Sequence, residues 1–366
     1  MPGSKKIIMK KTTTFLSALL FFSVAFAQHK TANVIIVTLD GMRWQEVFGG
    51  ADAAIIANKN FTYDSEQVVK DFWNDDVNER RKKLFPFFWN TIAANGQLYG
   101  NRNKGSFVNV ANPYRFSYPG YNEIFTGYPD TAVNSNDHIP NKNENVLEFI
   151  NQQKGYKAKV AAFSTWDCFP YILNKWRNGI YVNSDVDTLN FPDASLKLIN
   201  EMQFLTSKPI GVRPDVLTYF AGREYLKTYK PRVLYIAFDE TDDFAHGGEY
   251  DQYLKSAHAE DGMIADLWKL VQSMPEYKDK TTLLVLCDHG RGDTIKEQWT
   301  SHGEDVEGAD QIWLAAIGPD SKALGELVNS QQVYQRQVAT TIAALLGFDF
   351  KPAHPVMQPV SGIISK

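Results

Sequence analysis

Short runs of apolar, β-branched residues alternate along the chain with longer segments whose apolar residues recur at helical spacing. These runs are continuous, whereas a strand with one wet face alternates apolar and polar positions. They therefore predict parallel strands that are buried on both faces. The predicted strands are Val34–Leu39, Lys159–Phe163, Val233–Phe238, Thr282–Cys287 and Ile312–Ile317.

The segments between these runs predict helices. They are Phe85–Ala94, Val146–Gln153, Ala194–Phe204, Asp215–Thr228, Asp251–Met274 and Tyr334–Leu346. Strands that alternate with helices at this spacing predict an α/β fold, with a doubly wound, mainly parallel sheet and helices on both faces. Residues 50–80 and 104–145 are polar and turn-rich, and they predict loop insertions over a site rather than separate domains.

The N-terminus has the features of an export signal. Four lysines within residues 5–11 precede an apolar run, Thr14–Ala27, which ends Ala-Phe-Ala before Gln28. The run is shorter than the roughly 20 residues that a membrane-spanning helix needs, and small residues at these positions fit signal-peptidase cleavage. We therefore expect a signal peptide over residues 1–27 and one domain over residues 28–366. The mature protein is then periplasmic or secreted, without a membrane span.

Composition narrows the possible partners. The chain is 44% hydrophobic and 22% charged, which is typical of a globular protein and excludes a disordered one. Its formal net charge is −4, and the body of the chain has no dense basic run, so we expect no binding to duplex nucleic acid. An exported protein can keep disulfides, but Cys287 ends an apolar strand, and we expect it and Cys168 to be thiols.

Carboxylates and histidines follow several of the predicted strands. These residues are Asp40, Asp242, His246, Asp288 and His289, and a further one, His302, follows in a loop. Each alone is typical of a helix cap or a turn. Ligands bind at the carboxyl ends of strands in open parallel sheets, and histidine with carboxylate is a usual ligand set for zinc. Together they predict two metal sites that share one cleft.

Ser117 stands before a proline and the start of a predicted helix. By default a serine there is an N-cap. The same position also suits a nucleophile, because free N–H groups and the helix dipole favour an anion, and a metal lowers the pKa of a hydroxyl. The position alone leaves both roles open.

These motifs, in this order, resemble the alkaline phosphatase superfamily, and most closely its nucleotide pyrophosphatase/phosphodiesterase branch. The order is a strand ending in Asp-Gly, a hydroxyl-x-Pro helix start with Thr-Gly ten residues on, Asp-x-x-x-His, Asp-His-Gly and a late His-Gly. The matching residues are Asp40, Ser117, Thr126, Asp242, His246, Asp288, His289 and His302.

The resemblance implies an alkaline-phosphatase-like hydrolase with two divalent metal ions, both zinc. It assigns one ion to Asp40, Asp288 and His289, and the other to Asp242, His246 and His302. It also implies that Ser117 attacks phosphorus and forms a covalent phospho-enzyme. The expected substrate is a small-molecule phosphate ester.

The chain departs from the diesterase branch at several positions. That branch usually has Thr as the nucleophile and Asn-His after the proline, where this chain has Ser117 and Gly120-Tyr121. An asparagine of the branch also donates to the phosphate, and Asn134 and Asn136 are the candidates here. Monoesterases of the superfamily place Arg or Lys on the phosphate, and the comparable strand end, residues 162–167, has no cation. This favours a phosphodiester or pyrophosphate over a monoester.

Other functions stay open at this stage. Ser117–Tyr121 resembles the sulfatase Ser/Cys-x-Pro-x-Arg motif, with Tyr121 where the arginine stands, and a sulfatase binds one calcium ion rather than zinc. A non-catalytic exported binding module is the alternative outside enzymes. The leaving group and the oligomeric state are not indicated by the residues.

Overall fold

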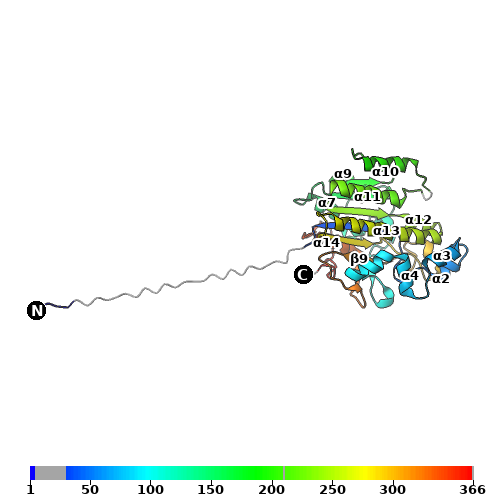
Figure 1. Cartoon of the computed structure of the whole chain (residues 1–366), viewed down its shortest axis with the longest axis horizontal. Helices are drawn as coiled ribbons and strands as arrows, with labels where there is room; N and C mark the ends of the chain where they lie inside the picture. The colour runs from blue at the N-terminus through cyan, green and yellow to red at the C-terminus, as the bar shows by residue number, and fades with distance from the viewer. Residues whose placement is uncertain (5–29, 209–210, 365–366) are drawn as a thin grey trace.

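The computed structural model describes residues 1–4, 30–208 and 211–364. The predicted signal peptide, residues 1–27, lies outside the described residues apart from its first four. Figure 1 shows the described chain from residue 30 on as layers of helices and strands.

Within the described residues, eight strands form one sheet. They lie in the order β10 (Gly325–Glu326), β2 (Gln97–Tyr99), β9 (Leu314–Ile317), β7 (Thr281–Leu286), β1 (Asn33–Leu39), β6 (Val233–Phe238), β4 (Val160–Ser164) and β5 (Tyr181–Ser184). The strands from β7 to β5 are mutually parallel. The predicted mainly parallel α/β fold is therefore confirmed.

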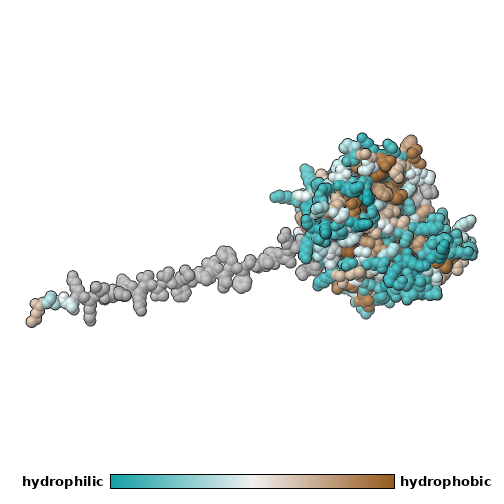
Figure 2. Space-filling view, viewed as in Figure 1, coloured by the Kyte–Doolittle hydropathy of each residue, from teal (hydrophilic) through white to brown (hydrophobic). Residues whose placement is uncertain are grey.

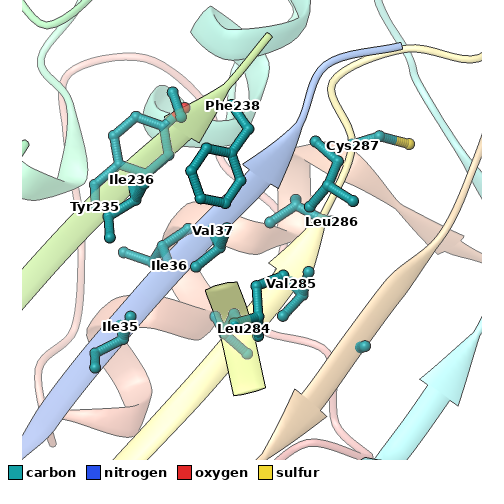
Figure 3. Packing of buried hydrophobic residues seen from close by; sticks show 14 of the residues in the cluster. Ile35, Ile36, Val37, Tyr235, Ile236, Phe238, Leu284, Val285, Leu286 and Cys287 are labelled. Carbon is teal, nitrogen blue, oxygen red and sulfur yellow. The ribbon is translucent and has the colours of Figure 1, made fainter. Parts of the chain in front are cut away.

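The centre of the sheet is apolar because β1, β6 and β7 are buried along their whole length. Figure 3 shows side chains from these neighbouring strands, among them Val37, Ile236 and Val285, packed in one cluster. Strands covered on both faces need apolar residues at every position, which explains the continuous runs in the sequence.

The predicted strand Ile312–Ile317 is wrong in its direction and its continuity. It consists of β8 (Gln311–Ile312) and β9, and β9 runs antiparallel to β7 and β2. The connection from β7 stays at the carboxyl edge and holds only a short 3-10 helix, η3 (Lys296–Thr300). Because no long crossover returns the chain to the other edge, β9 must enter the sheet in the opposite direction. β8 pairs instead with β3 (Val108–Asn109), which also pairs with β11 (Val333–Tyr334).

Helices cover both faces of the sheet. The predicted ones are confirmed as α7 (Val146–Gln152), α10 (Ala194–Leu205), α11 (Asp215–Tyr229), α13 (Tyr250–Ser273) and α14 (Val338–Leu345). Residues 85–94 instead form a π-helical turn, η1 (Phe88–Ile92), that runs into α5 (Ala93–Asn95). A short 3-10 turn, η4 (Gln335–Gln337), leads into α14.

The prediction of loops over residues 50–80 is wrong, because this segment contains α2 (Ala53–Ala57), α3 (Ser65–Phe72) and the start of α4 (Val77–Leu84). Aspartates cap all three helices. The side chains of Asp52, Asp64 and Asp76 accept hydrogen bonds from N–H groups of the first turns. These caps were a readable helix signal. Short elements also interrupt residues 104–145, of which η2 (Arg102–Lys104) and α6 (Ser117–Thr126) are helical.

The described surface is mostly hydrophilic, with hydrophobic residues at the end of the molecule where α10 lies (Figure 2). On this helix Leu198, Met202, Phe204 and Leu205 are exposed. None of the described helices is both long and apolar enough to cross a bilayer.

Cys168 and Cys287 are free and buried, which confirms the prediction of thiols.

A buried carboxylate joins α13 to the π-helical turn, and we expect it to stabilise the fold. Asp261 accepts hydrogen bonds from Phe87 N–H at 2.7 Å and Phe88 N–H at 3.0 Å. The change Asp261→Asn replaces one acceptor by a donor and leaves one of these N–H groups unpaired. The expected loss is about 1–3 kcal/mol of unfolding free energy, measured by urea denaturation. As a control, Asp266→Asn on the exposed side of α13 should cost less, and an equal loss would contradict this role of Asp261.

Candidate active site

The candidate residues meet because β6, β1 and β7 are neighbours and end at the same edge of the sheet. Asp40 directly follows β1, and Asp288 follows β7 by one residue. The chain leaves β6 into a short helix, α12 (Glu240–His246), which carries Asp242 and His246 four residues apart and so on one face. Adjacent strand ends thus bring together Asp40 and His289, which lie 249 positions apart in the sequence.

Asp40, Asp288 and His289 form one compact group, as expected for the first ion. The Nε2 atom of His289 lies 3.4 Å from Asp40 Oδ1 and 3.5 Å from Asp288 Oδ2. All three side chains are at most 1% exposed. The group is therefore preformed and buried.

The second compact group of possible ligands is Asp242, His289 and His302, and the expected ligand His246 lies beside it with a half-exposed side chain. His246 Nε2 lies 3.1 Å from Asp242 Oδ2 and 2.9 Å from His302 Nε2. His302 Nε2 lies 3.9 Å from Asp242 Oδ1. His289 is also close, at 3.7 Å from Asp242 Oδ1, so it stands between the two groups. The expected ligands are thus all gathered in one place.

Ser117 is the first residue of α6, and it is buried beside the first group. Its Oγ atom lies 3.4 Å from His289 Nε2. The helix comes this close because Gly120 has no side chain: a Cβ atom there would lie 2.6 Å from the backbone oxygen of Asp288. The predicted serine therefore faces the predicted ligands.

Both carboxylates of the first group leave one oxygen available. Tyr121 donates its phenol hydrogen to Asp40 Oδ2 at 2.8 Å, and Gly41 N–H donates to Asp288 Oδ1 at 3.1 Å. The other oxygens, Asp40 Oδ1 and Asp288 Oδ2, are buried without a hydrogen-bond partner among the described residues. Burying such an oxygen is costly unless a cation compensates it. The residues present therefore fit a divalent metal.

Backbone carbonyls contact the Nδ1 atom of two of the imidazoles and so orient both rings in the same way. His289 Nδ1 lies 3.0 Å from the carbonyl oxygen of Gly290, and His302 Nδ1 lies 3.3 Å from that of Arg115. A carbonyl accepts, so each Nδ1 carries a hydrogen, and Nε2 is the ring nitrogen directed toward the groups described above. This second contact is typical of metal-binding histidines.

The electrostatics of the site indicate a need for positive charge. Burial, and then repulsion by neighbouring carboxylates, raise the pKa of both Asp40 and Asp288 well above the usual range. Burial would also raise the pKa of Asp242, but the guanidinium of Arg291 and the hydrogen bond with His246 bring it well below that range. Burial, and then the charge of His289, lower the pKa of His302 to about 2, which keeps its imidazole neutral and able to bind metal.

The two asparagines proposed for the phosphate lie differently. Asn136 reaches the start of α6, where its Oδ1 accepts a hydrogen bond from Tyr118 N–H at 3.0 Å. Asn134 lines a cavity of about 280 Å³ that is also bordered by Tyr118 and Ile139. The structure thus brings Asn136 next to the residue that follows Ser117.

Sequence reasoning missed Arg291 and the contact that Tyr121 makes. Arg291 comes directly after Asp-His-Gly, it is 1% exposed, and its guanidinium contacts Asp242 Oδ1. A basic residue directly after a metal-ligand motif was the available signal. For Tyr121 no signal existed, because its partner Asp40 is 81 residues away.

A family model and several solved structures are similar to this chain. The family model described as "Type I phosphodiesterase / nucleotide pyrophosphatase" matches residues 51–343. This range contains the predicted serine and all the candidate ligands except Asp40. No curated protein matches the chain.

Solved structures share the fold at low sequence identity. Wild-type alkaline phosphatase PafA has a TM-score of 0.63 at 11% identity, over 93% of this chain and all of that one. The lipoteichoic acid synthase LtaP from Listeria monocytogenes has a TM-score of 0.57 at 13% identity, over 91% and 75% of the two chains. The 2-O GAG sulfatase BT1596 has a TM-score of 0.56 at 12% identity, over 90% and 73%.

We expect metal to stabilise the fold, because the unpartnered oxygens of Asp40 and Asp288 lose their compensation without it. Zinc held at about 100 times its Kd should add about 2.7 kcal/mol for each ion bound to the unfolding free energy of protein treated with a chelator. Thermal unfolding with and without zinc measures this difference.

His302→Ala should reduce the zinc content and this stabilisation together. His138→Ala is the matched control, because His138 stacks on Tyr171 at 4.6 Å and pairs with Asp167 away from the ligand groups. Equal zinc content and equal stabilisation in both variants would contradict the proposed ligand set.

Proposed function

The chain belongs to the type I phosphodiesterase/nucleotide pyrophosphatase family, and we propose that it is an exported two-metal phosphoesterase. In this proposal phosphodiesters or pyrophosphates are the preferred substrates, and hydrolysis proceeds through a phosphorylated Ser117. The proposal rests on one observation above all. Ser117 Oγ lies 3.4 Å from the imidazole that stands between the two ligand groups.

Nitrogen and carboxylate oxygen ligands support zinc as the metal. Asp40, Asp288 and His289 would hold one ion. Asp242, His246 and His302 would hold the other. When bound, such a pair of ions stabilises both the attacking and the leaving oxygens of an in-line phosphoryl displacement.

The chain's own residues define the two steps. Ser117 gives up its hydroxyl proton and its Oγ attacks phosphorus, so that the Oγ–P bond forms while the bond to the leaving oxygen breaks, and the leaving group departs as the protonated alcohol or phosphate. Water then attacks the phosphoserine, which releases the phosphate product and restores the Ser117 hydroxyl. Burial of Ser117 at the start of α6 supports this role, because the helix dipole favours the negative charge that develops there.

Asn136 is proposed to bind the phosphate. Tyr118 N–H holds its carbonyl oxygen at 3.0 Å, which leaves the amide nitrogen as a donor for an anion. Pro119 follows and has no N–H group, so the start of α6 has fewer backbone donors for an anion. A side-chain donor at this place adds to them. Asn134 remains the second candidate, since it lines the neighbouring cavity.

The hydrogen bonds of Arg291 support a preference for diesters. This buried cation contacts Asp242 Oδ1, and it also donates to the carbonyl oxygens of Asp242 and Thr300 at 3.0 and 2.8 Å. Its hydrogen bonds are thus directed to the protein rather than to a phosphate. A diester carries less negative charge than a monoester and needs less positive charge around it.

Three other functions are distinguished by experiment. A monoesterase or a sulfatase would use the same fold, and BT1596 illustrates that the fold alone does not separate them. A non-catalytic binding module would keep the ligand groups without turnover.

Export is proposed from the pattern in residues 1–27, and N-terminal sequencing of the protein recovered from the periplasm or medium tests it.

The mature protein from Gln28 onward should hydrolyse a nitrophenyl phosphodiester faster than the corresponding monoester or sulfate ester. Chelation should abolish turnover and zinc should restore it. Preference for the monoester or the sulfate would establish one of the alternative enzymes. Lack of turnover on all three substrates by the zinc-loaded protein would favour the binding module.

Ser117→Ala should reduce diester turnover by at least about a thousandfold, because the covalent step loses its nucleophile. Zinc content and thermal stability should stay close to those of the wild type. Ser106→Ala is the matched control: this serine is also buried, but its hydroxyl accepts from Gly100 N–H at 3.1 Å, away from the ligands. Normal turnover by Ser117→Ala would refute the covalent mechanism.

A further inference from the structure

Two side chains outside the ligand groups each hold one carboxylate of the centre in a single orientation. They are Tyr121, which contacts Asp40, and Arg291, which contacts Asp242. Neither was expected from the family motifs. Tyr121 stands where the branch usually has histidine, and Arg291 follows the last residue of Asp-His-Gly.

Tyr121 connects the nucleophile helix to the first ligand group. It lies four residues after Ser117, so the two side chains share one face of α6. Its ring is fully buried and packs edge-on against Phe169 at 4.6 Å. Its hydroxyl donates to Asp40 Oδ2, which leaves only Oδ1 directed toward His289. Rotation of the Asp40 carboxylate would break this hydrogen bond in a buried place, where it is costly to lose.

Arg291 connects two elements of the second ligand group. One side of its guanidinium contacts Asp242 Oδ1 and the carbonyl oxygen of Asp242 in α12. The other side donates to the carbonyl oxygen of Thr300, two residues before His302. Asp242 Oδ2 therefore remains directed toward His246, and the loop that carries His302 is tied to α12.

The backbone leaves room for this arginine at Gly41. Gly41 has φ +56°, and a Cβ atom there would lie 2.5 Å from Asp242 Oδ1 and 2.8 Å from Arg291 Nε. Any other residue at position 41 would thus have a strained backbone, and its Cβ atom would push Asp242 and Arg291 apart. The turn after β1 and the guanidinium are accordingly fitted to each other.

We propose that Tyr121 and Arg291 are positioning residues, each for a different half of the metal centre. Tyr121 presents Asp40 to the first ion, and Arg291 presents Asp242 and His302 to the second. The inference rests on the proposed function, because it requires that the two groups bind metal. Loss of such an outer contact typically weakens metal binding by about 10–100-fold.

The test compares zinc binding by Tyr121→Phe and Arg291→Lys with the wild type. Tyr121→Phe removes a single oxygen atom, and Arg291→Lys keeps the charge but cannot make the forked contact. Zinc content after dialysis against buffered free zinc, together with competition against a chelating dye, gives the number of ions bound and their Kd values. We expect two ions in the wild type, and in each variant one Kd raised by about 10–100-fold with the other unchanged.

Buried residues elsewhere provide matched controls. Tyr277→Phe removes a hydroxyl that donates to the carbonyl oxygen of Pro231 at 2.6 Å, and Arg213→Lys alters a fully buried arginine that contacts Asn183 and Thr218. Both should leave zinc binding unchanged. If Arg291→Lys is unfolded by circular dichroism, Arg291→Gln replaces it, since glutamine keeps a donor for Asp242.

The assignment of each residue to one half is tested in a His302→Ala background, which lacks a ligand of the second ion. There Tyr121→Phe should still weaken the remaining ion by about 10–100-fold, whereas Arg291→Lys should have no further effect. A wild type that binds no zinc would contradict the proposed function itself. A wild type with two ions and variants that bind like their controls, or variants that weaken both ions equally, would overturn the inference while leaving the proposed function intact.

Discussion

The burial of Asp40, Asp242 and Asp288 around the single imidazole of His289 is the constraint on which the rest of the structure depends. Carboxylates this close repel one another, and burial removes the water that would otherwise screen them. Some unfavourable energy is therefore stored at the edge of the sheet. The surrounding structure must be rigid enough to keep these groups from turning outward until a cation compensates them.

The sheet supplies that rigidity. Asp40 and Asp288 follow β1 and β7, which pair along their length and are buried throughout. An apolar strand covered on both faces cannot shift by one residue without placing a different set of side chains in the core. The positions of the two aspartates are thus fixed by the packing of residues such as Val37 and Val285 rather than by the aspartates themselves (Figure 3).

Most of this arrangement could be predicted from the sequence because its causes are local. Continuous apolar runs predict buried strands, and the residue after a strand lies at the edge whatever the rest of the chain does. The direction of β9 could not be predicted in this way, since it depends on whether the connection after β7 crosses back to the other edge of the sheet. The helices within residues 50–80 were missed for another reason: their caps Asp52, Asp64 and Asp76 are local signals that the overall polarity of the segment obscured.

The departures at Gly120 and Tyr121 have one physical explanation. Gly120 allows α6 to approach the backbone of Asp288 at a distance that no side chain would permit. This approach carries the next residue, Tyr121, into the space beside Asp40, where its hydroxyl reaches the carboxylate and its ring fills the gap against Phe169. Gly120 thus determines how closely α6 and its Ser117 approach the ligands, and Tyr121 determines the orientation of Asp40. The two differences from the usual family motif are better understood as one local adaptation than as two independent losses.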